Sequence, residues 1–413
     1  MIAVKDMCRF CKHPLEHSFC DLGMTPLSNA YLTKDQLERG ESFYPLHAYV
    51  CKECFLVQVK EYELPQNIFK DYAYFSSYSD SWLKHCEEYT EQMITRLKLS
   101  TSSQVIEIAS NDGYLLQFFK KHQIPVLGIE PAANVAAVAQ EKGIDSLVKF
   151  FGSQVAKELV DKNIQADLLI GNNVLAHVPE LNDFVKGLKI MLKSDGVITM
   201  EFPHLLRLME SYQFDTIYHE HFSYFSLLTV EKIFNRQGLK IFDVDELKTH
   251  GGSLRIYAGH IEDSEKQITP RVLDLKEREQ QLSFDDLGGY AQFYVDVQQL
   301  KSDLLSFFLN AKKQGKKIVG YGAPAKGNTL LNFCGIRSQL LEFTVDRSPH
   351  KQGHFLPGTH IPVYPVEEIA RTKPDYVFIL PWNLKEEIMG QMAFIREWGG
   401  KFVIPIPHLE ILD

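Results

Sequence analysis

The chain has 413 residues, of which 45% are hydrophobic and 23% are charged, so we expect two or three globular domains. Its 44 basic and 53 acidic residues give a formal net charge of −9, which argues against general binding to nucleic acid or anionic membranes. No apolar run reaches membrane-spanning length, and the N-terminus lacks the apolar region of a signal peptide. We therefore expect a soluble, cytoplasmic protein with reduced thiols.

The N-terminal region carries two Cys-x-x-Cys pairs, Cys8 with Cys11 and Cys51 with Cys54. Four thiolates in two close pairs are typical of a tetrahedral, structural zinc site, which leaves no open position for catalysis. Disulfides are the alternative, and a cytoplasmic setting argues against them. Three histidines are possible substitute ligands, and three further cysteines are expected to be buried; these residues are His13, His17, His47, Cys20, Cys86 and Cys334.

A segment rich in tyrosine and serine, residues 71–80, precedes an amphipathic helix predicted at about 81–97. Such a linker serves either as inter-domain packing or as a source of phenols for a site in the next domain. Under the second interpretation, Tyr72 is a candidate for the catalytic site, and Tyr74 and Tyr78 are candidates for substrate binding.

The middle of the chain has the pattern of a nucleoside-binding α/β unit. A buried parallel strand is predicted at 104–109, a turn follows at 110–113, and after a helix comes a second strand at 125–130. The second strand ends in Glu130, and another helix is predicted at 132–142. In this layout the ligand binds at the carboxyl ends of the strands, and the terminal acid accepts hydrogen bonds from ribose hydroxyls.

Two later strands continue this pattern, at 167–171 and 196–201. Asn172, Asn173 and His177 follow the first of them. They are therefore expected at the carboxyl edge of the sheet, where ligands bind in such folds.

The stretch 214–226 packs a phenol, two imidazoles and a carboxylate into four consecutive positions, Tyr218, His219, Glu220 and His221. Imidazoles exchange protons near neutral pH, and apolar neighbours predict partial shielding from water. The spacing does not match the His-Glu-x-x-His helix of zinc proteases. The alternative is a polar strand end with ordinary hydrogen-bonded histidines, but this density of titratable groups favours a catalytic site.

The pattern Glu107-x-Ala109-x-Asn111-x-Gly113 resembles the first motif of class I S-adenosylmethionine methyltransferases, an acid followed by three alternating glycines. Asparagine tolerates positive φ, so the turn can survive the replacement of a glycine. With the four cysteines and the Tyr-His-Glu-His stretch, nearly the whole chain resembles the sugar C-3 methyltransferases. The resemblance implies binding of S-adenosylmethionine by Glu107, Ala109, Ser110, Asn111, Gly113, Glu130, Asn172 and Asn173.

The known substrates of that family are nucleotide-linked 4-keto-6-deoxy sugars, which implies a role in the biosynthesis of branched-chain deoxysugars. A ketone at C-4 makes the C-3 proton acidic, so the enzyme needs a base near C-3 and hydrogen-bond donors near the C-4 oxygen. We expect His221 as the base, Glu220 as an orienting group, and Tyr218, His177 and Tyr72 as further catalytic residues. Tyr218 is the competing base, although a phenol would need a much lower pKa.

The C-terminal third begins with long helices predicted between 262 and 313, which link or brace the domains, and continues with a second α/β pattern. A strand at 317–320 leads into a turn at 320–328 that fits Gly-x-Gly-x-x-Ala. Asp346 lies about 20 residues further on, as a dinucleotide fingerprint requires. Asn328 occupies the position of the Walker lysine, so the turn is not a Walker loop. Further strands are predicted at 341–346, 375–380 and 401–405.

This turn supports an alternative function, an NAD(P)-dependent oxidoreductase acting on a nucleotide sugar. The resemblance instead implies that the domain binds the nucleotide half of the sugar substrate, with its pyrophosphate at a helix N-terminus. A domain without a ligand and a non-catalytic nucleotide-sugar binding protein are two further alternatives. The expected substrate-binding residues of this domain are Gly322, Lys326, Asn328 and Asp346.

The sequence therefore predicts an α/β protein with a class I methyltransferase Rossmann-like core. An N-terminal zinc-binding domain is expected at 1–80, the methyltransferase domain at 81–260, and a helical linker with a second Rossmann-like domain at 261–413. Because two packed α/β domains can make a self-sufficient unit, we expect a monomer.

Overall fold

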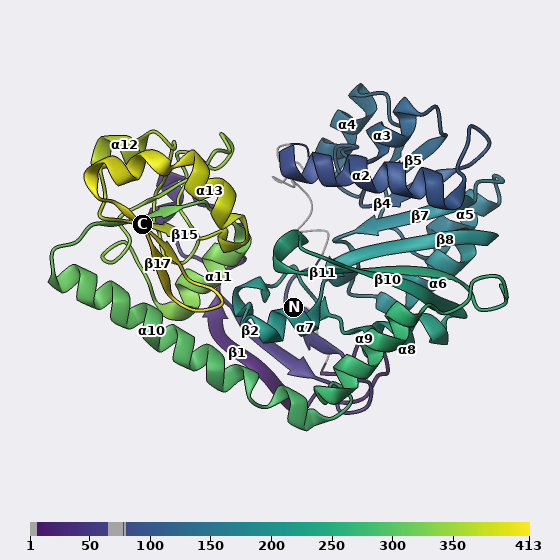
Figure 1. Ribbon diagram of the computed structural model, residues 1–413, viewed down its shortest axis with the longest axis horizontal. Coiled ribbons are helices and arrows are strands. Elements are labelled where there is room, and N and C mark those ends of the chain that lie inside the picture. The colour runs from purple at the N-terminus through teal and green to yellow at the C-terminus, as the bar shows by residue number, and fades with distance from the viewer. Residues whose placement is uncertain (1–5, 65–76, 78–79) are drawn as a thin grey trace.

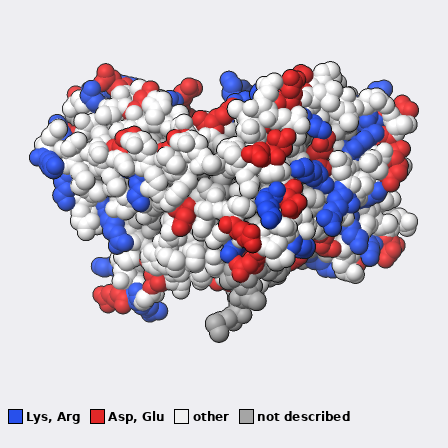
Figure 2. Space-filling model, turned by 90° about the horizontal axis from the view of Figure 1, so that it is seen from below, with Lys and Arg blue, Asp and Glu red and all other residues white. Residues whose placement is uncertain are grey.

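The computed structural model describes residues 6–64, 77 and 80–413, and the strands of these residues form sheets of four, seven and six strands. In Figure 1 the seven-stranded sheet lies on the right and the six-stranded sheet on the left, with the purple strands of the four-stranded sheet below and between them. Figure 2 shows acidic and basic side chains interspersed on the face that it presents. Within the described parts of the chain, no helix is long and apolar enough to cross a membrane.

The four-stranded sheet is antiparallel, and its last strand comes from the middle of the chain. The strands in order are β1 (His17–Thr25), β2 (Tyr44–Val50), β3 (Val57–Val59) and β9 (Ser223–Tyr224). A short helix, η1 (Lys34–Glu38), connects β1 to β2. Val57 pairs with Tyr224, and Gln58 pairs with Ser223. The stretch that holds the histidines is thus joined to the N-terminal sheet.

The seven-stranded sheet has the order β10-β11-β8-β7-β4-β5-β6. The strands from β8 to β6 are parallel, and β10 and β11 extend the sheet as an antiparallel edge. Their bounds are β4 (Val105–Ile108), β5 (Val126–Ile129), β6 (Ser146–Leu147), β7 (Ala166–Asn172), β8 (Leu192–Pro203), β10 (Leu239–Leu247) and β11 (Ser253–His260). After β4 the chain adds β5 and β6 on one side of this strand, and then returns to add β7 and β8 on the other side. The switch point of the sheet, where ligands bind in such folds, therefore lies between β4 and β7.

Helices cover both faces of this sheet, which explains why β4 is apolar at successive positions. Figure 1 shows α2, α3 and α4 above the sheet and α6 and α8 below it. Val105 of β4 packs into the upper core, whereas Ile106 packs into the lower core. The helices of the domain are α2 (Asp80–Leu97), α3 (Leu116–Lys121), α4 (Ala133–Glu141), α5 (Ser153–Val160), α6 (Leu181–Met191), α7 (Leu205–Glu210), α8 (Leu227–Arg236), η3 (Leu175–His177), η4 (Phe214–Thr216) and η5 (Thr249–Gly251).

The six-stranded sheet has the order β14-β13-β12-β15-β16-β17, and its strands are parallel except for β17. The parallel order and the helix after β12 confirm the second Rossmann-like pattern. The elements are β12 (Ile318–Tyr321), α11 (Ala325–Cys334), β13 (Thr344–Val345), β14 (Val363–Tyr364), α12 (Glu368–Thr372), β15 (Tyr376–Ile379), η7 (Trp382–Leu384), α13 (Lys385–Gln391), η8 (Ala393–Trp398), β16 (Lys401–Ile404) and β17 (Glu410–Leu412).

Two helices connect the Rossmann-like domains. The first, α9 (Pro270–Gln281), packs against α8 and β10, and the buried Glu279 accepts hydrogen bonds from the backbone N–H groups of Leu227 and Leu228. After η6 (Leu287–Tyr290), α10 (Phe293–Lys313) runs along the lower edge of the molecule towards the C-terminal domain (Figure 1). The linker is thus fixed to the methyltransferase core before the chain crosses over.

Candidate active site and metal centre

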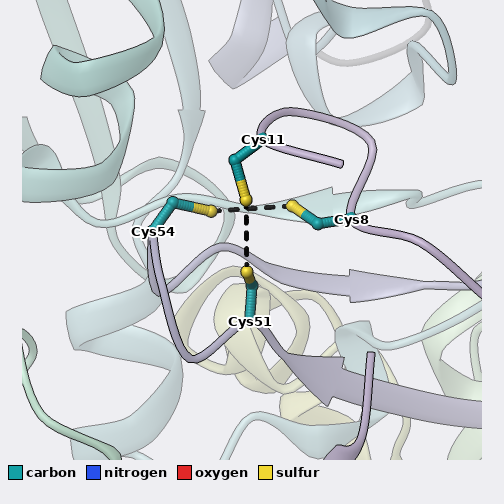
Figure 3. A group of neighbouring side chains, drawn as sticks. All are labelled: Cys8, Cys11, Cys51 and Cys54. Carbon is teal, nitrogen blue, oxygen red and sulfur yellow. Dashed lines mark hydrogen bonds between the residues drawn. The ribbon is translucent and has the colours of Figure 1, made fainter. Parts of the chain in front are cut away.

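The four cysteines of the two Cys-x-x-Cys pairs meet at one point, as Figure 3 shows. Their sulfur atoms all lie within 4.8 Å of one another, with Cys8 Sγ 3.6 Å from Cys54 Sγ and Cys11 Sγ 3.4 Å from Cys51 Sγ. A tetrahedral zinc with Zn–S bonds of about 2.3 Å places its sulfurs roughly 3.8 Å apart. The thiols are therefore arranged as ligands, and Gln58 donates an N–H···S hydrogen bond to Cys8 Sγ over 3.2 Å.

The other three cysteines of the chain and the three histidines considered as substitute ligands lie outside this metal centre. Cys20, Cys86 and Cys334 are buried free thiols, as the sequence predicted. His13, His17 and His47 are not part of the four-cysteine group.

The turn after β4 has the backbone that the glycine-rich pattern requires. Ala109, Asn111 and Gly113 all have positive φ, at 57°, 48° and 75°. Asn111 replaces a glycine of the motif and still adopts this left-handed conformation. Ala109 is strained in the same conformation, because its Cβ disfavours positive φ. A Cβ on Gly113 would lie 2.4 Å from the Ile144 side chain, so close packing also requires the glycine.

Glu130 holds this turn from the end of β5. Its carboxylate accepts hydrogen bonds from the backbone N–H of Asn111, at 2.9 Å, and of Ala132, at 2.8 Å. Burial raises the pKa of Glu130, although the two N–H donors oppose the shift. The acid thus links the two turns that border the predicted ribose position.

Buried polar atoms at the switch point fit a ligand rich in hydrogen-bonding groups. In the described part of the chain, Asn172 Oδ1, Asn173 Oδ1 and Ser110 Oγ are buried without a hydrogen-bond partner. Such atoms are uncommon in folded proteins unless a ligand or water binds them. Glu107 is fully buried, and burial raises its pKa well above the ordinary value. These residues therefore stay candidates for binding a polar ligand at the switch point.

The Tyr-His-Glu-His stretch forms a tight turn that brings Tyr218 onto His221. The His221 backbone N–H donates to the Tyr218 carbonyl at 2.9 Å, and the side chains meet with Tyr218 Oη 2.8 Å from His221 Nε2. His221 Nδ1 lies 2.9 Å from the Thr216 carbonyl oxygen, which can only accept. Nδ1 therefore carries the proton, and the Nε2 lone pair accepts the tyrosine O–H. The Thr216 carbonyl, rather than Glu220, orients His221.

His177, at the end of η3, completes the cluster. Its ring centroid lies 4.7 Å from that of His221 in an edge-on arrangement. Burial lowers the pKa of His177 to about 4 and lowers the pKa of His221 well below its usual range. Both imidazoles are consequently neutral at pH 7.

Glu220 and His219 point towards the N-terminal domain. Glu220 accepts a hydrogen bond of 2.7 Å from Asn29 Nδ2, and burial raises its pKa to about 7. His219 Nε2 lies 3.2 Å from the Pro45 carbonyl oxygen, and burial lowers its pKa to about 4. The first and last residues of the stretch, Tyr218 and His221, thus contact each other, whereas the two residues between them contact the N-terminal domain.

The predicted tyrosines of the linker, Tyr72, Tyr74 and Tyr78, lie outside the described residues.

In the C-terminal domain, Asp346 is bound to the glycine turn itself. Its carboxylate accepts hydrogen bonds from the backbone N–H groups of Ala323, at 2.7 Å, and Ser348, at 2.8 Å, and Lys351 lies 3.8 Å away. Gly322 has φ 88°, and a Cβ there would come within 2.5 Å of Pro381. The turn is therefore held in one shape, with Asp346 beneath it.

Of the other two predicted residues of this turn, Lys326 contacts η7 of its own domain and Asn328 contacts the N-terminal domain. Lys326 hydrogen-bonds Asn383 and lies over the Trp382 ring, with Nζ 4.3 Å from the centroid. Burial lowers the pKa of Lys326 to about 8. Asn328 donates from Nδ2 to the Ser28 carbonyl at 2.6 Å, so it holds the N-terminal loop against α11.

A set of residues at the junction of the domains was not predicted from the sequence. Trp382 Nε1 donates to Asp215 Oδ2 at 2.7 Å, and burial raises the pKa of Asp215 to about 6. His250 is held by Asn173, whose Nδ2 lies 3.0 Å from His250 Nε2. The Gly-Gly pair after His250 was a local signal for an unusual turn, whereas no local pattern distinguished Asp215 or Trp382.

The parallel switch-point sheet, the left-handed turn tied to an acid, and the four-thiol centre define a class I S-adenosylmethionine methyltransferase with a zinc-binding domain. Family models agree: residues 8–69 match a zinc binding domain, 82–244 a methyltransferase domain and 248–407 a C-methyltransferase C-terminal domain. The chain is 32% identical over 408 residues to the C-methyltransferase NovU of Streptomyces niveus, covering 99% of this chain and 97% of that protein. The protein therefore belongs to the C-methyltransferase family, uses S-adenosylmethionine as methyl donor and binds zinc.

Solved structures of other proteins also resemble part of the chain. The PH0226 protein of Pyrococcus horikoshii OT3 is 17% identical, with 47% of this chain and 97% of that chain covered at a TM-score of 0.36. The magnesium protoporphyrin IX methyltransferase ChlM of Synechocystis PCC 6803, with bound SAH, is 14% identical, with 47% and 91% covered at a TM-score of 0.34.

Proposed function

We propose that the enzyme transfers a methyl group from S-adenosylmethionine to C-3 of a nucleotide-linked 4-keto-6-deoxy sugar, through an enolate, in the biosynthesis of a branched-chain deoxysugar. The observation that carries this proposal is the Tyr218–His221 hydrogen bond, in which a neutral imidazole presents its lone pair to a phenol. Bound S-adenosylmethionine supplies an electrophilic methyl group. The chain must therefore make the sugar carbon nucleophilic, and the histidine cluster fits that task.

His221 accepts the C-3 proton in this proposal. Its Nδ1–H is fixed to the Thr216 carbonyl, so only Nε2 can take up a proton. The Tyr218 hydroxyl occupies Nε2, so it must either move aside for C-3 or pass the proton on to the imidazole. Because burial lowers the pKa of His221, the base is unprotonated at neutral pH.

The developing charge on the C-4 oxygen needs hydrogen-bond donors held in place before the reaction. Tyr218 and His177 are the donors that we propose, since both rings border His221. Burial keeps His177 neutral, so it acts as a hydrogen-bond donor and not as a cation.

The nucleotide half of the substrate is proposed to lie against the C-terminal domain. Backbone N–H groups at the start of α11 favour a diphosphate, and the charge of Lys326 lies on the same helix. The sugar would then extend towards the histidine cluster. Membership of the C-methyltransferase family argues against the alternative function, an oxidoreductase, which was inferred from the same glycine turn.

A cytoplasmic location is part of the proposal, because the thiols of the metal centre require a reducing compartment. We also propose a monomer, and light scattering of the zinc-loaded protein tests it.

Mass spectrometry of nucleotide-linked 4-keto-6-deoxy sugars, incubated with enzyme and donor, tests the reaction by the gain of one methyl mass. Proton exchange at C-3 in deuterated water, without the donor, tests the enolate step alone. We expect His221→Asn to bind both substrates but to lose turnover and exchange by orders of magnitude. Full exchange in His221→Asn with none in Tyr218→Phe would assign the base role to the tyrosine.

A further inference from the structure

His250 adopts a backbone conformation that the fold imposes on it. It lies in η5, between β10 and β11, with φ 54°, and Gly251 and Gly252 follow with φ 93° and 123°. Left-handed conformations are unfavourable for non-glycine residues and persist where the surroundings enforce them, often at functional sites.

The surroundings of His250 come from both Rossmann-like domains. Gln213 Nε2 donates to the Gly251 carbonyl at 2.7 Å, and a Cβ on Gly251 would lie 2.5 Å from the Trp382 ring. On the N-terminal side of His250, Thr249 Oγ1 donates a hydrogen bond of 2.8 Å to Glu201, which lies at the carboxyl end of β8. The turn is therefore fixed on both sides of the histidine, at the ligand-binding edge of the sheet.

The side chain of His250 is fixed as well. Asn173 Nδ2 lies 3.0 Å from His250 Nε2, and an amide nitrogen can only donate. Nε2 is therefore the acceptor, and the imidazole proton is on Nδ1. Among the residues that the structure describes, the His250 ring hydrogen-bonds Asn173 through Nε2, and no residue accepts from Nδ1. The Trp82 ring, with its centroid 5.3 Å away, borders the imidazole.

His250 also lies at the same edge of the sheet as the proposed base, because its partner Asn173 is four residues from His177, whose ring centroid lies 4.7 Å from that of His221. A positive charge on His250 would lower the pKa of His221, so the two imidazoles act on each other electrostatically. Burial lowers the pKa of His250 itself to about 4, so the ring stays neutral at pH 7. A neutral N–H donor thus lies at the same edge of the sheet as the histidine cluster and the donor-binding turn.

We propose that His250 is a further catalytic residue, whose Nδ1–H donates a hydrogen bond to the C-4 oxygen of the sugar as negative charge develops there. The inference rests on the proposed function. No proton leaves His250: the C-3 proton passes to the Tyr218–His221 pair, and the C–H electron pair moves into the enolate. A neutral imidazole suits this role, because it stabilises the oxyanion without protonating it.

Exchange of the C-3 proton into deuterated water, without the methyl donor, tests the inference. We expect His250→Leu to slow exchange by about 10²–10³-fold, which is typical for the loss of one oxyanion donor. His250→Asn should retain more activity, because asparagine tolerates the left-handed backbone and keeps an N–H donor. Sugar-nucleotide binding, measured by calorimetry, should change little. The matched control is His122→Leu, which removes an exposed histidine of the methyltransferase domain.

Exchange at the wild-type rate in His250→Leu would overturn the inference while leaving the proposed function intact. Absence of exchange in the wild type would overturn the proposed function, and the inference with it. Nitrogen-15 NMR spectra of the histidine-labelled wild type provide a second test. This test does not depend on whether a variant folds. The spectra should show the Nδ1-protonated tautomer of His250, and an Nε2-protonated ring would contradict the proposal.

Discussion

Replacing Glu220 by glutamine should stabilise the protein at alkaline pH. Glu220 is buried, with Asn29 as its hydrogen-bond donor, and burial raises its pKa from 4.5 to about 7. The native protein therefore keeps this proton up to about pH 7, whereas the unfolded chain releases it near pH 4.5. Between these values folding takes up a proton, so the free energy of unfolding falls as the pH rises.

The size of the effect follows from that pKa difference. Each pKa unit corresponds to ~1.4 kcal/mol, so the buried carboxyl costs about 3 kcal/mol of stability above pH 7 and nothing below pH 4.5. Glutamine keeps an oxygen that can accept from Asn29 but cannot ionise. Glu220→Gln should therefore gain up to about 3 kcal/mol at pH 8 relative to wild type, and little at pH 5.

Urea denaturation at pH 5 and pH 8 measures this difference, with the exposed Glu397→Gln variant as control. Equal shifts of the midpoint at both pH values would refute the reasoning, because they would show that Glu220 has the same pKa in the native and unfolded states.

Three further variants test the individual sites. Metal analysis should find one zinc per chain, and Cys51→Ala should lose it; a folded, metal-free wild type would contradict the centre. Glu130→Ala should weaken binding of S-adenosylmethionine by about 1–3 kcal/mol in calorimetry, as for a lost charge-assisted hydrogen bond, and unchanged affinity would count against the ribose position. Lys326→Ala should raise the Michaelis constant for the sugar nucleotide and leave donor binding alone; loss of donor binding instead would reverse the domain roles.

The parts of the fold that depend on local pattern were predictable from the sequence. The strand β4 is apolar at nearly every position because it is buried on both faces, and the two cysteine pairs have the spacing of a metal knuckle. The left-handed turn was predictable as well, because asparagine at position 111 is one of the few residues that tolerate it.

The partners of the polar side chains were not predictable, because they come from distant parts of the chain. Glu220 meets Asn29, which lies 191 residues earlier, and a backbone carbonyl orients His221 where the sequence suggested a carboxylate. Asp346 is predicted to bind a ribose from its spacing, which gave no sign that its carboxylate also accepts hydrogen bonds from the backbone of the turn. Spacing in the sequence predicts which residues lie together at the carboxyl edge of a sheet. Tertiary packing determines which hydrogen-bond partners they have there.

The pairing of β3 with β9 limits how this enzyme can be recombined with its relatives. β3 begins three residues after Cys54, and β9 begins two residues after His221, so one ladder joins the metal knuckle to the proposed catalytic turn. Asn29 adds a second tie from the same domain to Glu220. A chimera that exchanges only the central domain would place a foreign edge strand beside the zinc knuckle. Transfer of substrate preference between homologues will therefore require residues 17–59 and 214–226 to be exchanged together.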